Sequence, residues 1–152
     1  MQTQAYSSQQ LLPPSMFEQR LKGEIALYQR TGQPLACLAV LIREEDGSEP
    51  ASWYANEIAA TVAASCRPSD TVCHIEDGVL IVLAPATRLA KALQMGERIS
   101  NLLQDAFVAH RVTWTIAVSR PISKGDTNPI PRAIAAAESA LKYGGGQVIP
   151  VR

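Results

Sequence analysis

The sequence predicts a single α/β domain in which helices flank a mixed central sheet of about five strands. Segments with the spacing of amphipathic helices alternate with apolar runs of strand length, an order typical of helices packed on a sheet. The dipeptide Asp77-Gly78 joins two of these strands by a tight turn, so part of the sheet is antiparallel. The chain of 152 residues is long enough for one compact domain and short for two.

The first helix is predicted to follow a flexible N-terminal arm or linker formed by residues 1–14. Ser15 and Glu18 form the S-x-x-E pattern of a capping box, and apolar residues then recur at helical spacing. Gly32, soon followed by a proline, predicts that the helix ends near Thr31, because glycine favours the left-handed conformation that closes a helix.

The middle of the chain supplies the core of the predicted sheet. The continuous apolar run 34–42 is expected to be a strand that is covered on both faces. A helix is predicted over residues 51–66, with Trp53 among the residues of its apolar face. The strands 71–75 and 79–84 flank the tight turn and complete a hairpin.

The C-terminal part of the chain continues the alternation of helices and strands. An amphipathic pattern predicts a helix over 87–108, and alternating apolar residues predict a strand over 111–119. Asn128 is a favourable N-cap and precedes a proline, so a helix is expected from there to about Tyr143. Three glycines end that helix, and residues 147–151 are predicted to form a short last strand.

Charge balance and cysteine content exclude several classes of protein. The 14 basic and 14 acidic residues cancel, which argues against a nucleic-acid partner, since such proteins usually carry a basic excess. No apolar run reaches the roughly 20 residues of a membrane span. The cysteines Cys37, Cys66 and Cys73 lack paired spacing and are expected to be reduced thiols of a cytoplasmic protein.

Several short segments occur in the order and nearly at the spacing of one known domain family. CRPSDTVCHIEDGVLIVLAP (66–85) contains an RxxD motif followed by a hairpin, and GERI (96–99) is similar to a segment A-E-R-I. VTWTIAV (112–118) is similar to a strand V-T-x-S-I-G-V, and AAAESALK (135–142) to a helix A-D-x-A-L-Y. In these segments the chain resembles the GGDEF, or diguanylate cyclase, domain. The resemblance implies a degenerate GGDEF domain over 15–152, with a palm-like fold related to nucleotidyl cyclases.

The resemblance also implies that the family's catalytic residues are missing. The signature Gly-Gly-Asp-Glu-Phe falls on residues 76–80, where glycine and Val79 replace the acid pair. The family's other aspartates, in a D-x-D pattern, fall on Leu41 and Arg43, and residues 44–54 replace the base-binding segment. Phosphoryl transfer with two metal ions needs oxygen ligands, so we expect no catalytic residue, no metal or other cofactor, and no enzyme. Glu76 and Asp77 lie beside the turn, and we expect them to be ordinary residues of the hairpin and not replacements for the missing metal ligands.

The RxxD motif is formed by Arg67 and Asp70, at the family's offset before the hairpin. The resemblance implies that they bind cyclic di-GMP at the family's inhibitory site. In an exposed turn after a helix, residues three apart can project from the same side. The arginine can then donate two hydrogen bonds to guanine or phosphate, while the carboxylate accepts from the guanine N–H edge. The alternative is a structural ion pair in a turn at the end of the helix.

A third residue of the expected site is Arg98, which lies in the GERI segment. The resemblance implies that this arginine completes the site from a neighbouring molecule or face, which would allow a ligand-induced dimer. The alternative is a solvated helix residue that pairs with Glu97 or Asp105. Together with Arg67 and Asp70, the ligand-binding role is favoured.

Two functional hypotheses follow. The first is a catalytically inactive GGDEF domain that acts as a cyclic di-GMP receptor through the RxxD motif. It would relay the signal to an unidentified protein partner, such as bacterial exopolysaccharide, adhesion or motility machinery. The second is a ligand-free interaction or scaffold domain in which the motif is a relic. A residual enzyme is a third class, and the loss of the family's acids argues against it. Nucleotide titration separates the first two.

Overall fold

The computed structural model describes residues 11–107, 111–121, 123, 125–126 and 128–151. The strands and helices in chain order are β1 (Leu11–Leu12), α2 (Pro14–Thr31), β2 (Leu35–Glu44), α3 (Ser52–Ser65), β3 (Thr71–Glu76), β4 (Val79–Pro85), α4 (Leu89–Phe107), β5 (Val112–Ser119), α5 (Ile130–Leu141) and β6 (Gln147–Pro150). Within these described ranges, no helix is long and apolar enough to cross a membrane.

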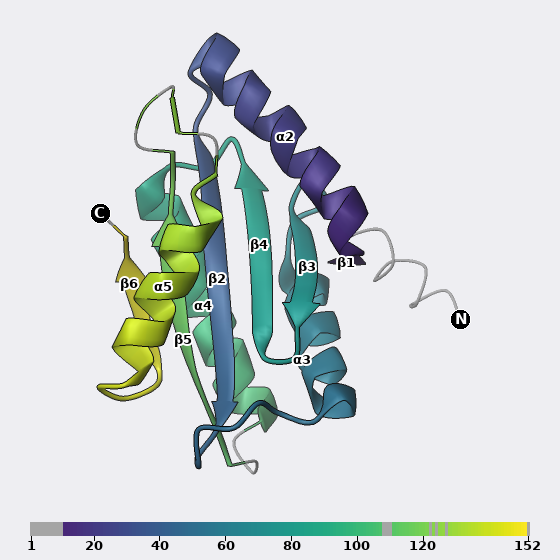
Figure 1. The fold of residues 1–152 in the computed structure, drawn as a ribbon, viewed down its shortest axis with the longest axis vertical. Helices are drawn as coiled ribbons and strands as arrows, with labels where there is room; N and C mark the ends of the chain where they lie inside the picture. Colours follow the sequence, from purple (N-terminus) through teal and green to yellow (C-terminus); the bar gives the residue numbers. More distant parts are fainter. Residues whose placement is uncertain (1–10, 108–110, 122, 124, 127, 152) are drawn as a thin grey trace.

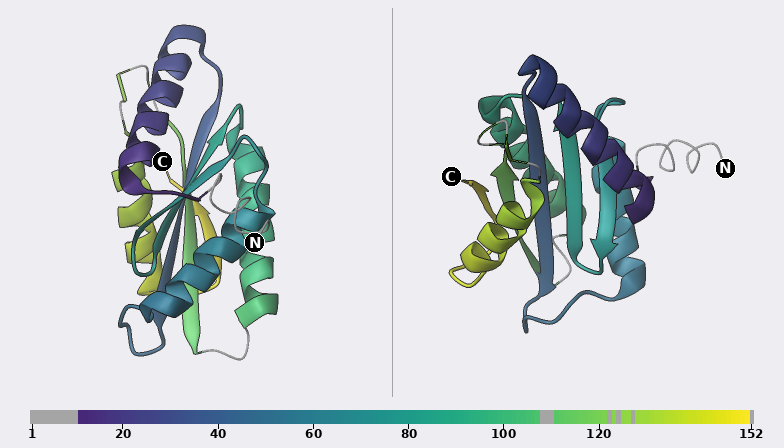
Figure 2. Two further views of the ribbon diagram at one scale, coloured as in Figure 1. Left: turned by 90° about the vertical axis from the view of Figure 1, so that its right-hand side faces the viewer. Right: turned by 45° about the horizontal axis from the view of Figure 1, so that its top comes forward.

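The strands form one mixed sheet in the order β1-β3-β4-β2-β5-β6. Helices α2 and α5 cover one face of the sheet, and α3 and α4 cover the other (Figures 1 and 2). Strand β2 pairs antiparallel with both β4 and β5, whereas the two edge strands β1 and β6 pair in parallel. The predicted α/β fold, a mixed sheet flanked by helices, is confirmed.

The sheet has six strands, and the strand that the sequence did not predict is β1. Its two residues pair with β3, with Leu11 opposite Val72 and Leu12 opposite Cys73. The prediction assigned them to the N-terminal arm, because two residues are too short to show the alternation that indicates a strand. The pairing depends on a partner that lies sixty residues away along the chain. Residues 1–10 of the predicted arm lie outside the described residues.

The N-cap of helix α2 lies two residues before the Ser15 that the capping box predicted. Pro13 is the N-cap and Pro14 occupies the first turn, so Ser15 lies inside the helix and no side chain caps its start. Proline suits this position because its missing N–H would have no partner in the first turn. The predicted end is correct, because Gly32 adopts a left-handed φ of 74° and its N–H donates to the carbonyl of Tyr28.

Helix α3 buries a different aromatic residue from the one that the sequence analysis placed in the core. Trp53 is 63% exposed, whereas the neighbouring Tyr54 is 3% exposed. The Tyr54 ring packs edge-on against Phe107 of α4, with ring centroids 5.3 Å apart. Tyr54, Ile58 and Val62 follow each other at intervals of four, and they form the buried stripe. The expectation for Trp53 is therefore wrong by one position on the helix.

The C-terminal elements lie close to their predicted bounds. Trp114 of β5 is buried and its indole N–H donates to the hydroxyl of Ser100 on α4. The Asn128 side chain accepts a hydrogen bond from the N–H of Ile130, as a capping residue does, although α5 itself begins at Ile130. The helix ends at Leu141, two residues before the predicted end.

The tight turn between β3 and β4 depends on Gly78. Its φ of 87° lies in the left-handed region, and its carbonyl accepts a hydrogen bond from Ile42 of β2 at 2.8 Å. A Cβ at this position would lie 2.5 Å from the Ile42 carbonyl oxygen and 2.9 Å from the ring of Pro50. Glycine is therefore required both by the backbone conformation and by the space.

We predict that Gly78→Ala lowers the free energy of unfolding by about 3 kcal/mol, because it combines backbone strain with a steric conflict. Gly47→Ala is the matched control, because Gly47 has a φ of 90° and nothing within 4 Å of an added Cβ. Backbone strain alone should then cost about 1 kcal/mol. Urea denaturation measures both values, and equal losses for the two variants would contradict the assigned packing around Gly78.

Candidate functional site

The RxxD motif lies in the turn that connects α3 to β3. The chain leaves α3 at Ser65, and the N–H of Asp70 donates to the carbonyl of Arg67 at 2.9 Å, which closes the turn. Pro68 lies within this turn and cannot continue a helix. The local geometry therefore brings the ends of the motif together, as the spacing of the motif predicts.

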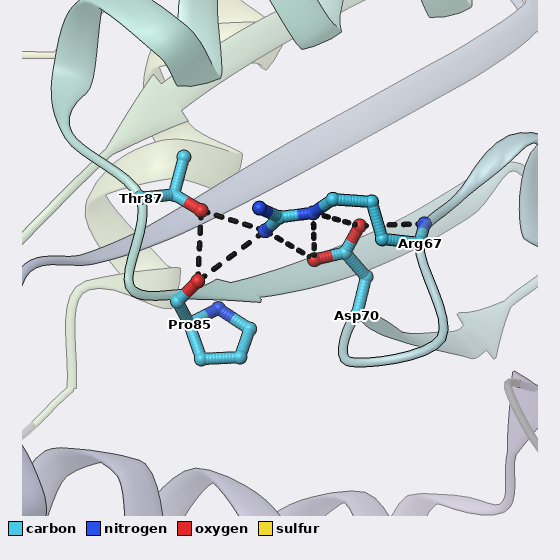
Figure 3. A network of polar contacts seen from close by, with 4 residues as sticks. All are labelled: Arg67, Asp70, Pro85 and Thr87. Atoms are coloured by element: carbon cyan, nitrogen blue, oxygen red, sulfur yellow. Dashed lines mark hydrogen bonds and ion pairs between the residues drawn. The ribbon is translucent and has the colours of Figure 1, made fainter.

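Arg67 and Asp70 are joined by several hydrogen bonds, drawn in Figure 3. The Asp70 carboxylate accepts from the backbone N–H of Arg67 at 2.9 Å, from its Nε at 3.1 and 3.2 Å and from its Nη2 at 2.7 Å. The side chain of Asp70 is 0% exposed, whereas that of Arg67 is 47% exposed. The expectation of an exposed aspartate is therefore wrong. In this arrangement Asp70 holds the guanidinium of Arg67 in place.

The same guanidinium is held from its other side by the loop between β4 and α4. Nη2 of Arg67 donates to the Thr87 hydroxyl at 2.7 Å and to the Pro85 carbonyl at 3.3 Å. The Thr87 hydroxyl in turn donates to the Pro85 carbonyl at 2.8 Å (Figure 3). Between them, Ala86 has a φ of 52°, a left-handed conformation that is strained for a residue with a Cβ. Thr87 was not predicted as a site residue.

A pocket of about 350 Å³ opens beside this loop. Its lining combines the motif arginine, the loop and one face of α4: Arg67, Ala86, Thr87, Lys91, Gln94, Met95 and Arg98. Two of the three predicted site residues, Arg67 and Arg98, thus meet at one pocket, and Asp70 lies behind Arg67. None of the described residues that line the pocket is acidic, so the ionisable groups among them are all cationic.

Arg98 does not form the ion pairs that the alternative interpretation expected. Arg98 is exposed, and neither Glu97 nor Asp105 pairs with it in the described part of the chain. The ion-paired alternative for this residue therefore has no support in the described structure. The arginine remains available to a ligand in the pocket.

Two groups at the site, Arg67 and Cys66, have raised pKa values. The hydrogen bond to Asp70 raises the pKa of the Arg67 guanidinium above its ordinary value. Burial, and to a smaller extent the Asp70 charge, raise the pKa of the adjacent Cys66 thiol to about 12, although Arg98 and Arg67 act in the opposite direction. Cys66 is thus a neutral thiol, and none of the three cysteines forms a disulfide.

The positions of the family's metal ligands lie at the opposite end of β4. Leu41 and Val79 are directly paired across β2 and β4, and both side chains are buried. Neither side chain carries an oxygen, so the side chains at these two positions cannot ligate a divalent cation. Among the described residues, no three of the types His, Cys, Asp and Glu are grouped as metal ligands would be. Cyclase chemistry in this chain would have to draw its metal ligands from other positions.

No protein-family model and no curated protein matches the chain. Several solved structures share its fold. The GGDEF domain of PA1120 (YfiN or TpbB) from Pseudomonas aeruginosa has a TM-score of 0.77 and 19% identity, over 95% of this chain and 99% of that chain. The GGDEF domain of DgcB from Caulobacter crescentus, solved in complex with c-di-GMP, has a TM-score of 0.73 and 14% identity, over 92% and 88%.

A third similar structure is the diguanylate cyclase SiaD from Pseudomonas aeruginosa, in complex with its activator SiaC. Its TM-score is 0.73 at 20% identity, and the match covers 91% of this chain and 58% of that chain. The expectation that the chain is not an enzyme is contradicted here, because the structures of this fold include diguanylate cyclases, which are enzymes. The chain has the fold of GGDEF domains.

We predict that Asp70→Ala lowers the free energy of unfolding by about 2–3 kcal/mol, because it removes a buried acceptor of several charge-assisted hydrogen bonds. Asp105→Ala is the matched control, since Asp105 is an exposed aspartate on α4 and should change stability by less than about 0.5 kcal/mol. Chemical denaturation measures both variants. If Asp70→Ala unfolds at the same urea concentration as the wild type, Asp70 does not hold the turn.

Proposed function

We propose that the chain is a receptor for cyclic di-GMP, which binds in the pocket between Arg67 and Arg98. The observation that carries the proposal is that the Arg67 guanidinium is both held in place and exposed. Its guanidinium is fixed by a fully buried carboxylate and by Thr87, yet its side chain is 47% exposed at the pocket. A fixed, exposed guanidinium loses little rotational freedom when it binds a ligand.

The chemistry of the pocket suits an anionic guanine nucleotide. Arginine donates charge-assisted hydrogen bonds to phosphate and to the O6 and N7 atoms of guanine. Because Nε and Nη2 of Arg67 already donate to protein acceptors, we propose that its Nη1 faces the ligand. Arg98 adds a second guanidinium, from α4. In this proposal Arg67 and Arg98 contact the ligand, and Asp70 keeps Arg67 oriented.

The solved structures of the same fold support both a nucleotide ligand and a protein partner. The DgcB domain is described in complex with c-di-GMP, and SiaD in complex with an activator protein. We infer that ligand binding changes how this chain interacts with a protein partner in the cytoplasm. That partner belongs to the exopolysaccharide, adhesion or motility machinery. Because Arg98 is exposed on α4, a ligand held there could also bridge two copies of the chain.

A ligand-free scaffold is the second candidate function, and one observation favours it. The contacts of Arg67 with Asp70, Thr87 and Pro85 join the turn between α3 and β3 to the loop between β4 and α4. The motif therefore stabilises the turn in its own right. A scaffold would keep this network and bind no nucleotide.

Calorimetric titration with cyclic di-GMP separates the two candidates. We predict a dissociation constant in the micromolar range or below, about −8 kcal/mol or better. Arg67→Ala should abolish binding, and Arg67→Lys should bind poorly, because one ammonium cannot replace the contacts of Nε and Nη2 with Asp70 and Thr87 and also bind the ligand. Arg20→Ala, which breaks a surface pair with Glu24 on α2, is the control and should bind like the wild type.

Arg67→Ala also removes the ion-pair partner of the buried Asp70 carboxylate, so a second variant keeps the test independent of folding. Arg98→Glu breaks no hydrogen bond or ion pair in the described structure and reverses one charge of the pocket. It should weaken binding at least tenfold while its melting temperature stays near that of the wild type. Absence of heat with the wild-type chain at saturating ligand would refute the receptor and leave the scaffold.

A further inference from the structure

The pocket carries a third cation that the RxxD motif does not include. Lys91, Gln94 and Arg98 follow at intervals of three and four along α4, so they share one helix face, and all three are exposed. Lys91 forms no hydrogen bond or ion pair with any described residue. Its ammonium group is therefore available at the pocket and uncompensated by an acid.

The position of Lys91 is unfavourable for the stability of α4. The helix begins at Leu89, so Lys91 lies in its first turn, where the helix dipole disfavours a positive charge. The first turn contains no acidic residue that would offset this cost, and Arg88 immediately precedes the helix. When a residue at the edge of a pocket lowers the stability of its own helix, a role in ligand binding is the favoured explanation.

Lys91 and Arg98 stand at the two ends of this helix face. They are seven positions apart in the sequence, which corresponds to about 10 Å along the helix axis. Arg67 approaches from the α3–β3 turn, so cations reach the pocket from two elements and at both ends of α4's exposed face. This distribution suits a ligand whose negative charge is divided between two phosphates better than a ligand with a single charged group.

We propose that Lys91 contacts a phosphate of the bound nucleotide and favours ligands with two phosphodiester groups over ligands with one. The proposal rests on the proposed function of the same pocket and adds a residue to it. Lys91 holds one phosphate of the cyclic dinucleotide near the start of α4. The two arginines bind the remainder of the ligand. The cost of a lysine in the first turn of α4 is then offset when the ligand is bound.

The test compares Lys91→Gln with the wild type in calorimetric titrations of cyclic di-GMP and of cyclic GMP, which has one phosphate. Lys91→Gln should weaken cyclic di-GMP binding about tenfold, with a smaller effect on cyclic GMP, and the remaining affinity should depend less on salt. Lys91→Arg should restore most of the affinity. Lys22→Gln is the control, because Lys22 is an exposed lysine on α2 that pairs with Glu18 outside this pocket.

Thermal unfolding of the free protein provides a second readout with the opposite sign. Lys91→Gln should raise the melting temperature by about 1–3 °C, because it removes a charge that opposes the helix dipole. A lysine with a purely structural role would instead give a lower melting temperature. Weaker binding together with higher stability is thus the expected result.

The outcomes separate this inference from the proposed function. If the wild type binds no cyclic di-GMP, both proposals are overturned. If the wild type binds, Arg98→Glu weakens binding, and Lys91→Gln binds with wild-type affinity and salt dependence, then only the role of Lys91 is wrong. If Lys91→Gln weakens both ligands by the same factor, Lys91 contributes affinity but does not select for two phosphates.

Discussion

The architecture depends on a central strand that is apolar on both of its faces. In β2, the residues from Leu35 to Ile42 are all buried, and alternate side chains face the two helical layers. The same strand hydrogen-bonds along its length to β4 on one side and to β5 on the other. A polar residue in its middle would be cut off from water on every side. Because β2 pairs with β4 along its length, it fixes where both ends of β4 lie. The turn at Gly78 and the loop between β4 and α4, which begin at these ends, are positioned with them.

Most elements could be predicted because their signals are local. Helical spacing located the four helices, and Asp77-Gly78 located the hairpin. The failures share a physical reason, which is that the deciding contact lies far away along the chain. Strand β1 exists through its pairing with β3, and Tyr54 replaces Trp53 in the core because of Phe107 on α4. At the start of α2, two prolines determined the boundary more strongly than the capping pattern did.

In the site, too, local features could be predicted from the sequence and features that depend on distant contacts could not. The spacing of Arg67 and Asp70 predicted that they would meet, and the segment resemblance placed Arg98 near them. The burial of Asp70 could not be predicted, because it arises from the packing of the turn. Thr87 also escaped prediction, although threonine before a helix is a common capping signal, because its partner Arg67 lies twenty residues earlier. The expectation that the chain is no enzyme came from single positions, whereas the comparisons address the fold as a whole.

The burial of Asp70 has a consequence for how such motifs change in evolution. Loss of either Arg67 or Asp70 alone leaves the other with an unmet charge or hydrogen bond, so a single mutation is disfavoured whether or not a ligand binds. Purifying selection on folding would thus preserve an RxxD pattern long after a signalling role had lapsed. An exposed cation that pairs with no described residue, such as Arg98, receives no such protection. Its persistence among descendants of this sequence would report selection for a ligand, whereas the persistence of RxxD would not.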